Sequence, residues 1–411
     1  MVGPLDSRLV PSVPTTASVV APQIGSRAGL PTGGPAGGTV ERSPRLHAVT
    51  GLRWWAALAV LGHHLLNVTT VPAPLTAVLQ QGVLGVTFFF VLSGFVLVWS
   101  MRPGVRPREF YRRRFARIYP LHLVTLLLAL PVFYSFHPSP EQWWVKPVSV
   151  GVLALSVPVL QGWSRDPTVM YSGNPTAWTL TLEAFFYTLF PFLALALRRT
   201  GRRGAGLVVV GLLTLAGALR ALTQLDPGGW VAGLPFPVLR VDEFALGMAL
   251  AWAMRLGWRP RLSPSLVALV GAGWFALYLA LGGEHPHLPV ARAFAPYLPE
   301  IVMALCGAMI VATAVAELRG RARWLGWRPV VVLGEWSFAL YLVHSMLIYV
   351  VLGTVGRLAA GPASLLGSLA LLVASVAAAA VLHVAVERPL ERRLRGRSPT
   401  HASVSGCASS S

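Results

Sequence analysis

Residues 49–68, VTGLRWWAALAVLGHHLLNV, form an apolar stretch with an arginine near its start and a histidine pair near its end. A helix turns about 100° per residue, so His64 lies within about 20° of the face of Arg53 and about 16 Å further along the axis. His63 points toward a different neighbour. Ionisable groups in an apolar span usually face a bundle interior or a wet cavity. The stretch therefore predicts a membrane helix that brings Arg53 and His64 into a functional site.

Each of these residues also has a structural interpretation. Arg53 alone is as well explained by a long side chain anchored at the membrane interface. A packed or interfacial histidine is the favoured explanation of His63. The face shared with Arg53 favours a functional role for His64, because an imidazole can take a proton near neutral pH.

The composition of the chain is that of a protein with many membrane spans. Of 411 residues, 55% are hydrophobic and only 12% are charged, with a mean hydropathy of +0.62. The net charge is +19, but the basic residues gather between hydrophobic runs, as the positive-inside rule predicts. The charge therefore does not indicate nucleic-acid binding, and a CoA-like or anionic-lipid partner stays open. Cys306 and Cys407 offer neither a disulfide framework nor metal-ligand spacing.

The hydrophobic segments predict an all-α integral membrane protein with about ten transmembrane helices. The segments are 51–67, 82–101, 117–134, 177–197, 205–222, 237–255, 264–282, 298–316, 331–353 and 363–386. If the weak segment 148–162 does not cross, all basic clusters fall on the side of the N-terminus. We therefore expect both termini in the cytoplasm and 148–162 to be re-entrant or at the outer surface.

The ends of the chain differ in composition from its middle. Residues 1–43 are rich in Pro, Gly, Ser, Thr and Val and contain no aromatic residue. We expect a disordered cytosolic lead over 1–43, a transmembrane domain over 44–395 and a disordered tail over 396–411.

Small and basic residues mark the second and third predicted spans. Ser93 and Gly94 interrupt the second span, where close approach of a ligand competes with ordinary helix packing as the explanation. Four arginines between 112 and 117 stand at the start of the third. They could hold the phosphates of an acyl-CoA, or only fix the topology, which is favoured for all except Arg117.

A polar stripe of Thr179, Glu183 and Tyr187 follows the fourth predicted span at i, i+4 spacing. A carboxylate in a span is costly unless it is paired, so we expect Glu183 to contact Arg53, His64 or another polar group.

Two later spans also carry polar residues. Arg240, Asp242 and Glu243 open the sixth span, where an acceptor site competes with a solvated helix end as the explanation. Tyr341 and His344 share one face of the ninth span with Ser337. This face either lines a polar cavity or consists of hydrogen-bonded core positions.

Six stretches between about residues 46 and 395 resemble, in order and spacing, the acyltransferase-3 family of integral membrane O-acyltransferases. They are VTGLRWWAALAVLGHH (49–64), FFFVLSGFVL (88–97), RRRFARIYPLH (112–122), NPTAWTLTLEAFFYTLFP (174–191), LGEWSFALYLVHS (333–345) and VERPLE (386–391). In that family an arginine and a histidine separated by ten residues form the essential pair, and Arg53 and His64 match this spacing. The family's other motifs match Ser93, Gly94 and Phe95; Arg117, Tyr119 and Pro120; Trp178, Leu180 and Glu183; and Tyr341 and His344.

Two features depart from part of the family. We expect no appended extracytoplasmic hydrolase-like domain, and FFY follows Glu183 where a more polar sequence of the EEQFY type is usual. The chain is in this respect similar to stand-alone members that acylate sugars of macrolides or other natural products.

The resemblance implies an enzyme of the cell membrane that moves a small acyl group from cytosolic acyl-CoA to a hydroxyl. The acceptor would be a sugar-containing natural product or a surface glycan, and no bound cofactor or metal is expected. The expected catalytic residues are Arg53, His64 and Glu183, with His64 as base or transient acyl carrier. Donor binding is expected from Ser93, Gly94, Arg117 and Tyr119, and an acceptor cavity from Trp178, Glu243, Tyr341 and His344. A multi-span transporter or flippase without covalent chemistry is the alternative.

Overall fold

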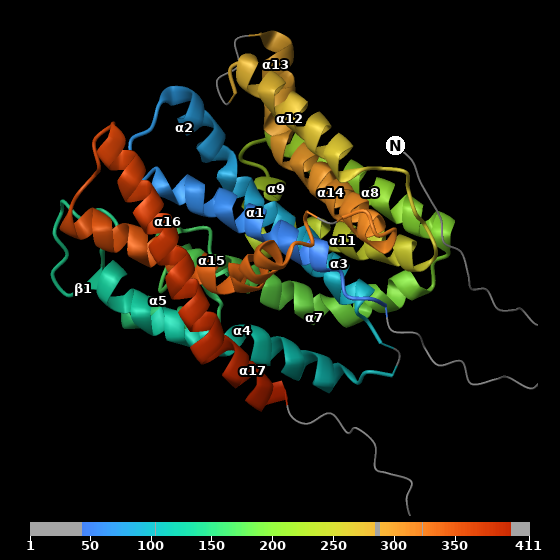
Figure 1. Ribbon diagram of the computed structural model, residues 1–411, viewed down its shortest axis with the longest axis horizontal. Helices are drawn as coiled ribbons and strands as arrows, with labels where there is room; N and C mark the ends of the chain where they lie inside the picture. The colour runs from blue at the N-terminus through green and yellow to red at the C-terminus, as the bar shows by residue number, and fades with distance from the viewer. Residues whose placement is uncertain (1–42, 103, 284–287, 323, 396–411) are drawn as a thin grey trace, which may run out of the picture. The chain divides into compact units, whose positions relative to one another are not determined.

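The structure, a computed structural model, describes residues 43–395 except 103, 284–287 and 323 (Figure 1). The expected N-terminal lead, apart from Ser43, and the expected tail over 396–411 lie outside the described residues. Helices dominate the described part. A two-stranded parallel sheet, β1 (Tyr134–Ser135) with β2 (Lys146–Pro147), is the one small exception among the described residues.

Each of the ten hydrophobic segments coincides with a helix. These helices are α1 (His47–Leu65), α3 (Gly85–Trp99), α4 (Pro107–Phe133), α7 (Trp178–Arg198), α8 (Arg202–Leu225), α11 (Val241–Arg255), α12 (Pro264–Ala280), α14 (Leu298–Leu318), α15 (Arg328–Thr354) and α16 (Pro362–Leu382). Within the described residues, seven helices are long and apolar enough to cross a membrane, and α12 is a shorter apolar helix. The helices α1 and α11, which carry Arg53, His64 and Glu243, are outside these eight. The chain is therefore an all-α membrane protein with several spanning helices.

Shorter elements connect the long helices. They are α2 (Ala73–Gln80), η1 (Gln81–Leu84), α5 (Val150–Ser156), η2 (Gln161–Trp163), α6 (Pro167–Met170), η3 (Pro175–Ala177), α9 (Trp230–Gly233), α10 (Phe236–Leu239), α13 (Pro289–Phe294), η4 (Ala295–Tyr297), the π-helix η5 (His383–Glu387) and α17 (Arg388–Arg395).

Helix α1 packs against α15, and the two run parallel. At one end, a Cβ atom on Gly334 would lie 2.0 Å from the carbonyl oxygen of Thr50. At the other end, the ring centroids of His64 and His344 lie 5.0 Å apart. This packing places the second half of α1, with His64, beside the part of α15 that carries His344.

Helix α11 lies at the centre of the bundle and contacts α3, α7, α8 and α14. Ten of its fifteen residues are buried. Two glycines allow α3 and α11 to touch: a Cβ atom on Gly94 would lie 1.9 Å from the oxygen of Phe244, and one on Gly247 would lie 1.8 Å from the oxygen of Val91. Small residues at a helix crossing permit this close approach of two backbones.

The described chain begins and ends at the same end of the bundle. Trp99, at the end of α3, donates from Nε1 to the carbonyl of Pro44 at 3.0 Å, and Arg117 of α4 pairs with Glu387, just before α17. We call this end the basic end and the opposite one, where α3 begins and α4 ends, the distal end. The arginines that define the basic end are Arg113, Arg114, Arg117 and Arg395.

Segment 148–162 is not among the candidate membrane spans of the described residues. Its helix α5 has seven residues, about 10 Å of helix, which is too short to span a membrane. His122 of α4 donates from Nε2 to the carbonyl of Ser156 at 2.8 Å, and the Ser156 hydroxyl lies 2.7 Å from that of Ser172. Asn174 donates to the carbonyl of Leu342 at 2.8 Å. The contacts of Ser156 are buried and hold the end of α5 against α4. The expectation that this segment is re-entrant or at the outer surface stays a prediction.

Candidate functional site

Four cavities follow α3 from the basic end to the distal end. Its residues Leu97, Ser93, Phe90 and Thr87 each line a different one. We call the cavities, in this order, the basic pocket (about 410 Å³), the inner cavity (about 220 Å³), the small cavity (about 70 Å³) and the distal pocket (about 450 Å³). Helix α3 is thus the common wall of a series of spaces that runs through the bundle.

The inner cavity collects charged residues from three helices. Arg53 comes from α1, Glu183 from α7, and Arg114 and Arg117 from α4. Glu183 is hydrogen-bonded to Tyr187 on its own helix, and the three arginine charges act favourably on its carboxylate. The expectation that Glu183 contacts Arg53, His64 or another polar group is confirmed by its hydrogen bond with Tyr187.

A hydroxyl chain extends this cluster to α3. The hydroxyls of Ser93 and Tyr187 lie 3.2 Å apart, and Tyr187 also contacts Glu183. The guanidinium of Arg114 lies 6.0 Å from the centre of the Tyr187 ring. Ser93 thus contributes a polar group to the wall of the inner cavity.

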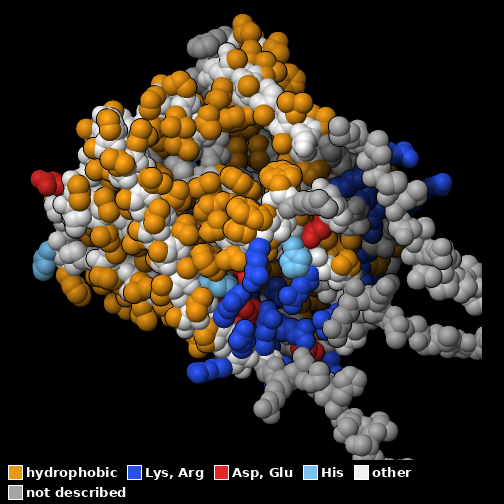
Figure 2. All heavy atoms as spheres, viewed as in Figure 1, with side chains coloured by type: hydrophobic (Ala, Val, Ile, Leu, Met, Phe, Trp, Pro, Cys, Tyr) orange, Lys and Arg blue, Asp and Glu red, His pale blue; other side chains and the backbone are white. Residues whose placement is uncertain are grey.

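The basic pocket adjoins the inner cavity, because Leu97 and Arg114 line both. Four arginines line the basic pocket, and the rings of Phe110 and Phe190 stack in its wall with centroids 4.8 Å apart. Figure 2 shows basic side chains gathered on the face that carries α17 and the neighbouring part of α4. The four arginines are Arg102, Arg113, Arg114 and Arg198.

The small cavity joins the inner cavity to the polar face of α15. Arg53 and Glu183 line both cavities, and Tyr341 lines the small one. The Tyr341 hydroxyl donates to the carbonyl of Thr176 and accepts from the hydroxyl of Thr179, each at 3.0 Å. Tyr341 is therefore fixed in orientation beside the Arg53 and Glu183 side chains.

His64 lies in a separate cluster of histidines. Its ring centroid is 5.2 Å from that of His63 and 5.0 Å from that of His344. His63 donates from Nδ1 to the carbonyl of Gln80 at 2.8 Å, away from His344, as the helical periodicity predicts. His64 is not among the residues that line the four cavities. Because α1 is one unbroken helix, His64 and Arg53 stay about 16 Å apart along it.

A hydrogen bond to the backbone fixes the tautomer of the neutral His344 ring. Its Nδ1 donates to the carbonyl of Leu340 at 3.0 Å, so the neutral ring carries its lone pair on Nε2. This Nε2 is buried and has no hydrogen-bond partner among the described residues. The Tyr341 and His344 ring centroids lie 6.0 Å apart, which connects the histidine cluster to the small cavity.

The distal pocket contains a buried ion pair. Glu243 is only 6% exposed and pairs with Arg240 at 2.7 Å, and Arg240 also donates to Thr87 at 2.8 Å. The alternative of a solvated helix end for Glu243 is therefore wrong. The Arg240 guanidinium lies 5.0 Å from the centre of the Phe90 ring, which also lines the small cavity.

Besides His64 and His344, three of the expected site residues do not line these four cavities. Gly94 packs against α11, the Tyr119 ring stacks on Phe115 at 4.5 Å, and the Trp178 ring lies 5.9 Å from that of Phe236. Among the described residues, no group of three or more His, Cys, Asp or Glu side chains could hold a metal ion.

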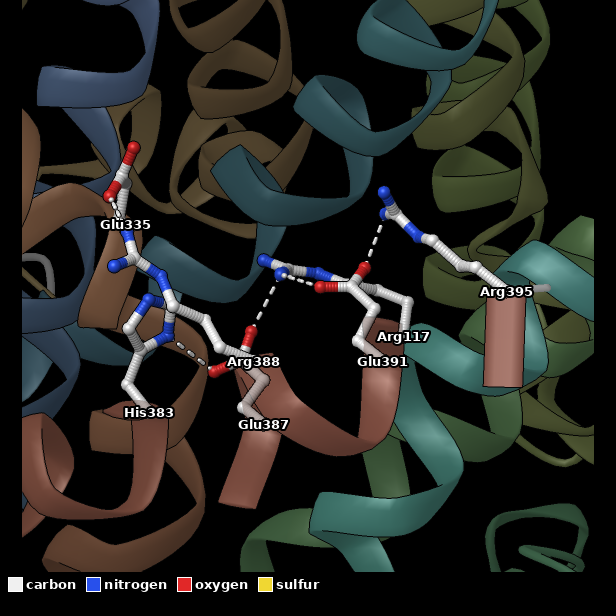
Figure 3. A network of polar contacts seen from close by, with 7 residues as sticks. All are labelled: Arg117, Glu335, His383, Glu387, Arg388, Glu391 and Arg395. Atoms are coloured by element: carbon white, nitrogen blue, oxygen red, sulfur yellow. Dashed lines mark hydrogen bonds and ion pairs between the residues drawn. The ribbon is translucent and has the colours of Figure 1, made fainter. Parts of the chain in front are cut away.

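The site also contains residues that the sequence interpretation did not assign. Arg220 pairs with Glu300 at 2.9 Å in the distal pocket, and Glu387 and Glu391 pair with Arg117 beside the inner cavity (Figure 3). The VERPLE stretch contains both Glu387 and Glu391, but the sequence alone does not predict that they pair with Arg117.

Residues 46–384 match the family model described as an acyltransferase domain. Acyltransferase MdmB of Streptomyces mycarofaciens is 33% identical over 390 residues, which cover 87% of this chain and 95% of that protein. Peptidoglycan O-acetyltransferase OatA of Listeria monocytogenes is 24% identical over 330 residues, covering 72% of this chain and 48% of the relative. The putative peptidoglycan O-acetyltransferase YrhL of Bacillus subtilis is 24% identical over 314 residues, covering 72% and 47%. This chain thus spans about half the length of the two peptidoglycan enzymes. No solved structure matches it.

Proposed function

Since this chain belongs to the acyltransferase-3 family of membrane acyltransferases, we propose that it transfers a small acyl group from acyl-CoA to a hydroxyl of a sugar-containing acceptor. The observation that carries the proposal is the inner cavity, where Arg53, Arg114 and Arg117 surround Glu183 next to an arginine-lined pocket. The names of two relatives support an acetyl group and a glycan acceptor.

The basic pocket suits the nucleotide end of an acyl-CoA. Guanidinium groups bind phosphates through paired, charge-assisted hydrogen bonds, and four arginines line this pocket. The stacked rings of Phe110 and Phe190 give it an apolar wall. The inner cavity of about 220 Å³ is smaller than a typical ligand site and suits the thiol arm with a short acyl group.

Transfer to a hydroxyl needs a base and a partner for the charge on the thioester oxygen. The acceptor oxygen attacks the thioester carbonyl, its proton passes to a base, and the thiolate of CoA leaves. His64 is the proposed base, and Arg53, which lines the same cavity as Glu183, is assigned to the donor. A transient acyl-His64 is the alternative role, and it would account for the distance between the two residues along α1.

The arginines favour one orientation in the membrane. Because basic loops stay on the cytoplasmic side, we assign the basic end to the cytoplasm together with both termini. This arrangement gives cytosolic acyl-CoA direct access to the basic pocket, in a chain embedded in the cell membrane with about ten helices.

The test is mass spectrometry of total glycans and secreted small molecules from cells with wild-type protein, with the His64→Ala variant, or with no protein. A species heavier by one acyl group should appear with wild type and disappear with His64→Ala. His63→Ala is the matched control, because His63 has the same side chain and points to Gln80. If the mass-spectrometric profiles of all cells are identical and uptake or export of a solute depends on the protein, the enzyme proposal is wrong. The transporter alternative then takes its place.

A further inference from the structure

The VERPLE stretch, residues 386–391, begins just after the end of the family match at residue 384. It contains the end of the π-helix η5 and the start of α17. Helix α17 packs along α4, the helix that carries Arg117. Single-turn π-helices occur often at functional sites, because the wider turn turns side chains to new directions.

Two carboxylates of this segment hold Arg117 (Figure 3). Its Nη1 lies 2.6 Å from Oε1 of Glu387 and 3.3 Å from Oε2 of Glu391. The second oxygen of Glu387 accepts from Nδ1 of His383 at 2.8 Å, and the second oxygen of Glu391 pairs with Arg395. Each carboxylate is thus fixed by two partners, so its position relative to Arg117 is well defined.

Burial distinguishes this cluster from an ordinary surface ion pair. The Glu387 side chain is 1% exposed and that of His383 is 4% exposed, whereas Arg117 is 25% exposed and lines the inner cavity. The pair between Arg388 and Glu335, at 2.9 Å, involves the same segment but is 48% and 42% exposed. Exposed pairs contribute little to the position of either side chain.

Glu387 also acts on a second arginine of the site. The positive charges of Arg53 and Arg117 repel each other, and the Glu387 charge attracts both. Without that carboxylate, two guanidinium groups would face each other at the wall of a largely buried cavity. Arg117 is 25% exposed, so burial alone does not fix its guanidinium, and the two carboxylates are the ion-pair partners that hold it.

We propose that Glu387 and Glu391 are positioning residues that hold the Arg117 guanidinium at the wall of the inner cavity, so that it binds the anionic donor. This inference rests on the proposed function, since the donor is the acyl-CoA assigned there. It makes the C-terminal helix, which follows the matched family domain, a part of the donor site.

The test is binding of CoA to the purified full-length protein in detergent by isothermal titration calorimetry. We expect Glu387→Gln to weaken binding about tenfold and Glu391→Gln about threefold, because each removes a charge that orients Arg117. The matched control is Glu335→Gln, which removes the exposed pair on the same segment and should leave the dissociation constant within about twofold of wild type. The unfolding temperature and the size-exclusion profile show whether each variant is folded.

A purely structural role of Glu387 would lower the unfolding temperature and leave the CoA affinity of the folded protein unchanged. That result, or tighter CoA binding by Glu387→Gln, would overturn the inference. If Glu387→Gln does not fold, Glu391→Gln decides the matter, since it leaves Glu387 in place. Failure of wild type to bind CoA would instead remove the proposed donor, and with it this inference.

Discussion

Arg53 is placed between two carboxylates from different parts of the chain. The charges of Glu183 on α7 and Glu387 before α17 both attract its guanidinium. Arg53 also lines both the inner cavity and the small cavity. Arg53 therefore lies where the inner cavity, beside the proposed donor pocket, adjoins the small cavity.

Replacing Arg53 by Ala should weaken acyl-CoA binding at least about tenfold, because the donor loses one of its cationic contacts. The same change removes a cation whose charge favours the Glu183 carboxylate, so we expect the unfolding temperature to fall as well. Calorimetric CoA titration and the unfolding temperature measure the two effects separately. The control is Trp55→Ala on the same helix, where the side chain is 48% exposed. Unchanged CoA affinity in folded Arg53→Ala would remove Arg53 from the donor site.

Helical geometry explains which candidate residues the sequence placed correctly. Ser93 and Gly94 are adjacent letters but point about 100° apart, so Ser93 faces the inner cavity and Gly94 faces α11. Arg117 and Tyr119 separate in the same way: the arginine lines the cavity and the tyrosine stacks on Phe115. A sequence motif contains neighbouring residues on all faces of a helix, whereas a site is formed by the residues on one face.

At the level of helix pairs, the crossing of α3 and α11 holds the cavity wall in place. A Cβ atom on Gly94 would lie 1.9 Å from the backbone oxygen of Phe244, which cannot move without displacing α11. The sequence offered close helix packing as one explanation of Gly94, and the structure supplies the partner helix. The partner could not be predicted, because it lies some 150 residues away.

Gly94→Ala should destabilise the protein by about 1–3 kcal/mol, since the added methyl group overpacks the crossing. Gly206→Ala on α8 is the control, because a Cβ atom there meets nothing within 4 Å. Replacing a helical glycine in open space should be neutral or slightly stabilising. Thermal unfolding in detergent compares the two variants. Equal unfolding temperatures would contradict the close crossing.

For the whole molecule, hydrophobicity and the distribution of arginines predicted most of the architecture. Each of the ten apolar segments contains a helix, and among the described residues seven helices are long and apolar enough to cross a membrane. Segment 148–162 forms only the short helix α5 and the 3-10 turn η2. What composition could not predict is how the loop between α4 and α7 is held. Its contacts run from Ser156 to His122 and from Asn174 to Leu342, so they depend on tertiary packing between distant parts of the chain.

The cavity series makes the enzyme directional. The basic pocket opens where the arginines gather, and the distal pocket lies at the other end of α3. The proposed donor, acyl-CoA, is too highly charged to cross a bilayer, so the proposal requires that the basic pocket faces the compartment that contains it. The proposed orientation places that side in the cytoplasm.

The most direct test is transfer of radiolabel from acetyl-CoA in sealed membrane vesicles of opposite orientation, supplied with the cell's glycans and small molecules. The account predicts alkali-labile labelled esters when the cytoplasmic face is outside. It predicts no label when that face is enclosed, and none with His64→Ala in either orientation. Label formed equally in both orientations would contradict the proposed sidedness. A different result would contradict acyl transfer itself: no labelled ester forms in any vesicle, while wild type and His63→Ala both transport an unmodified solute.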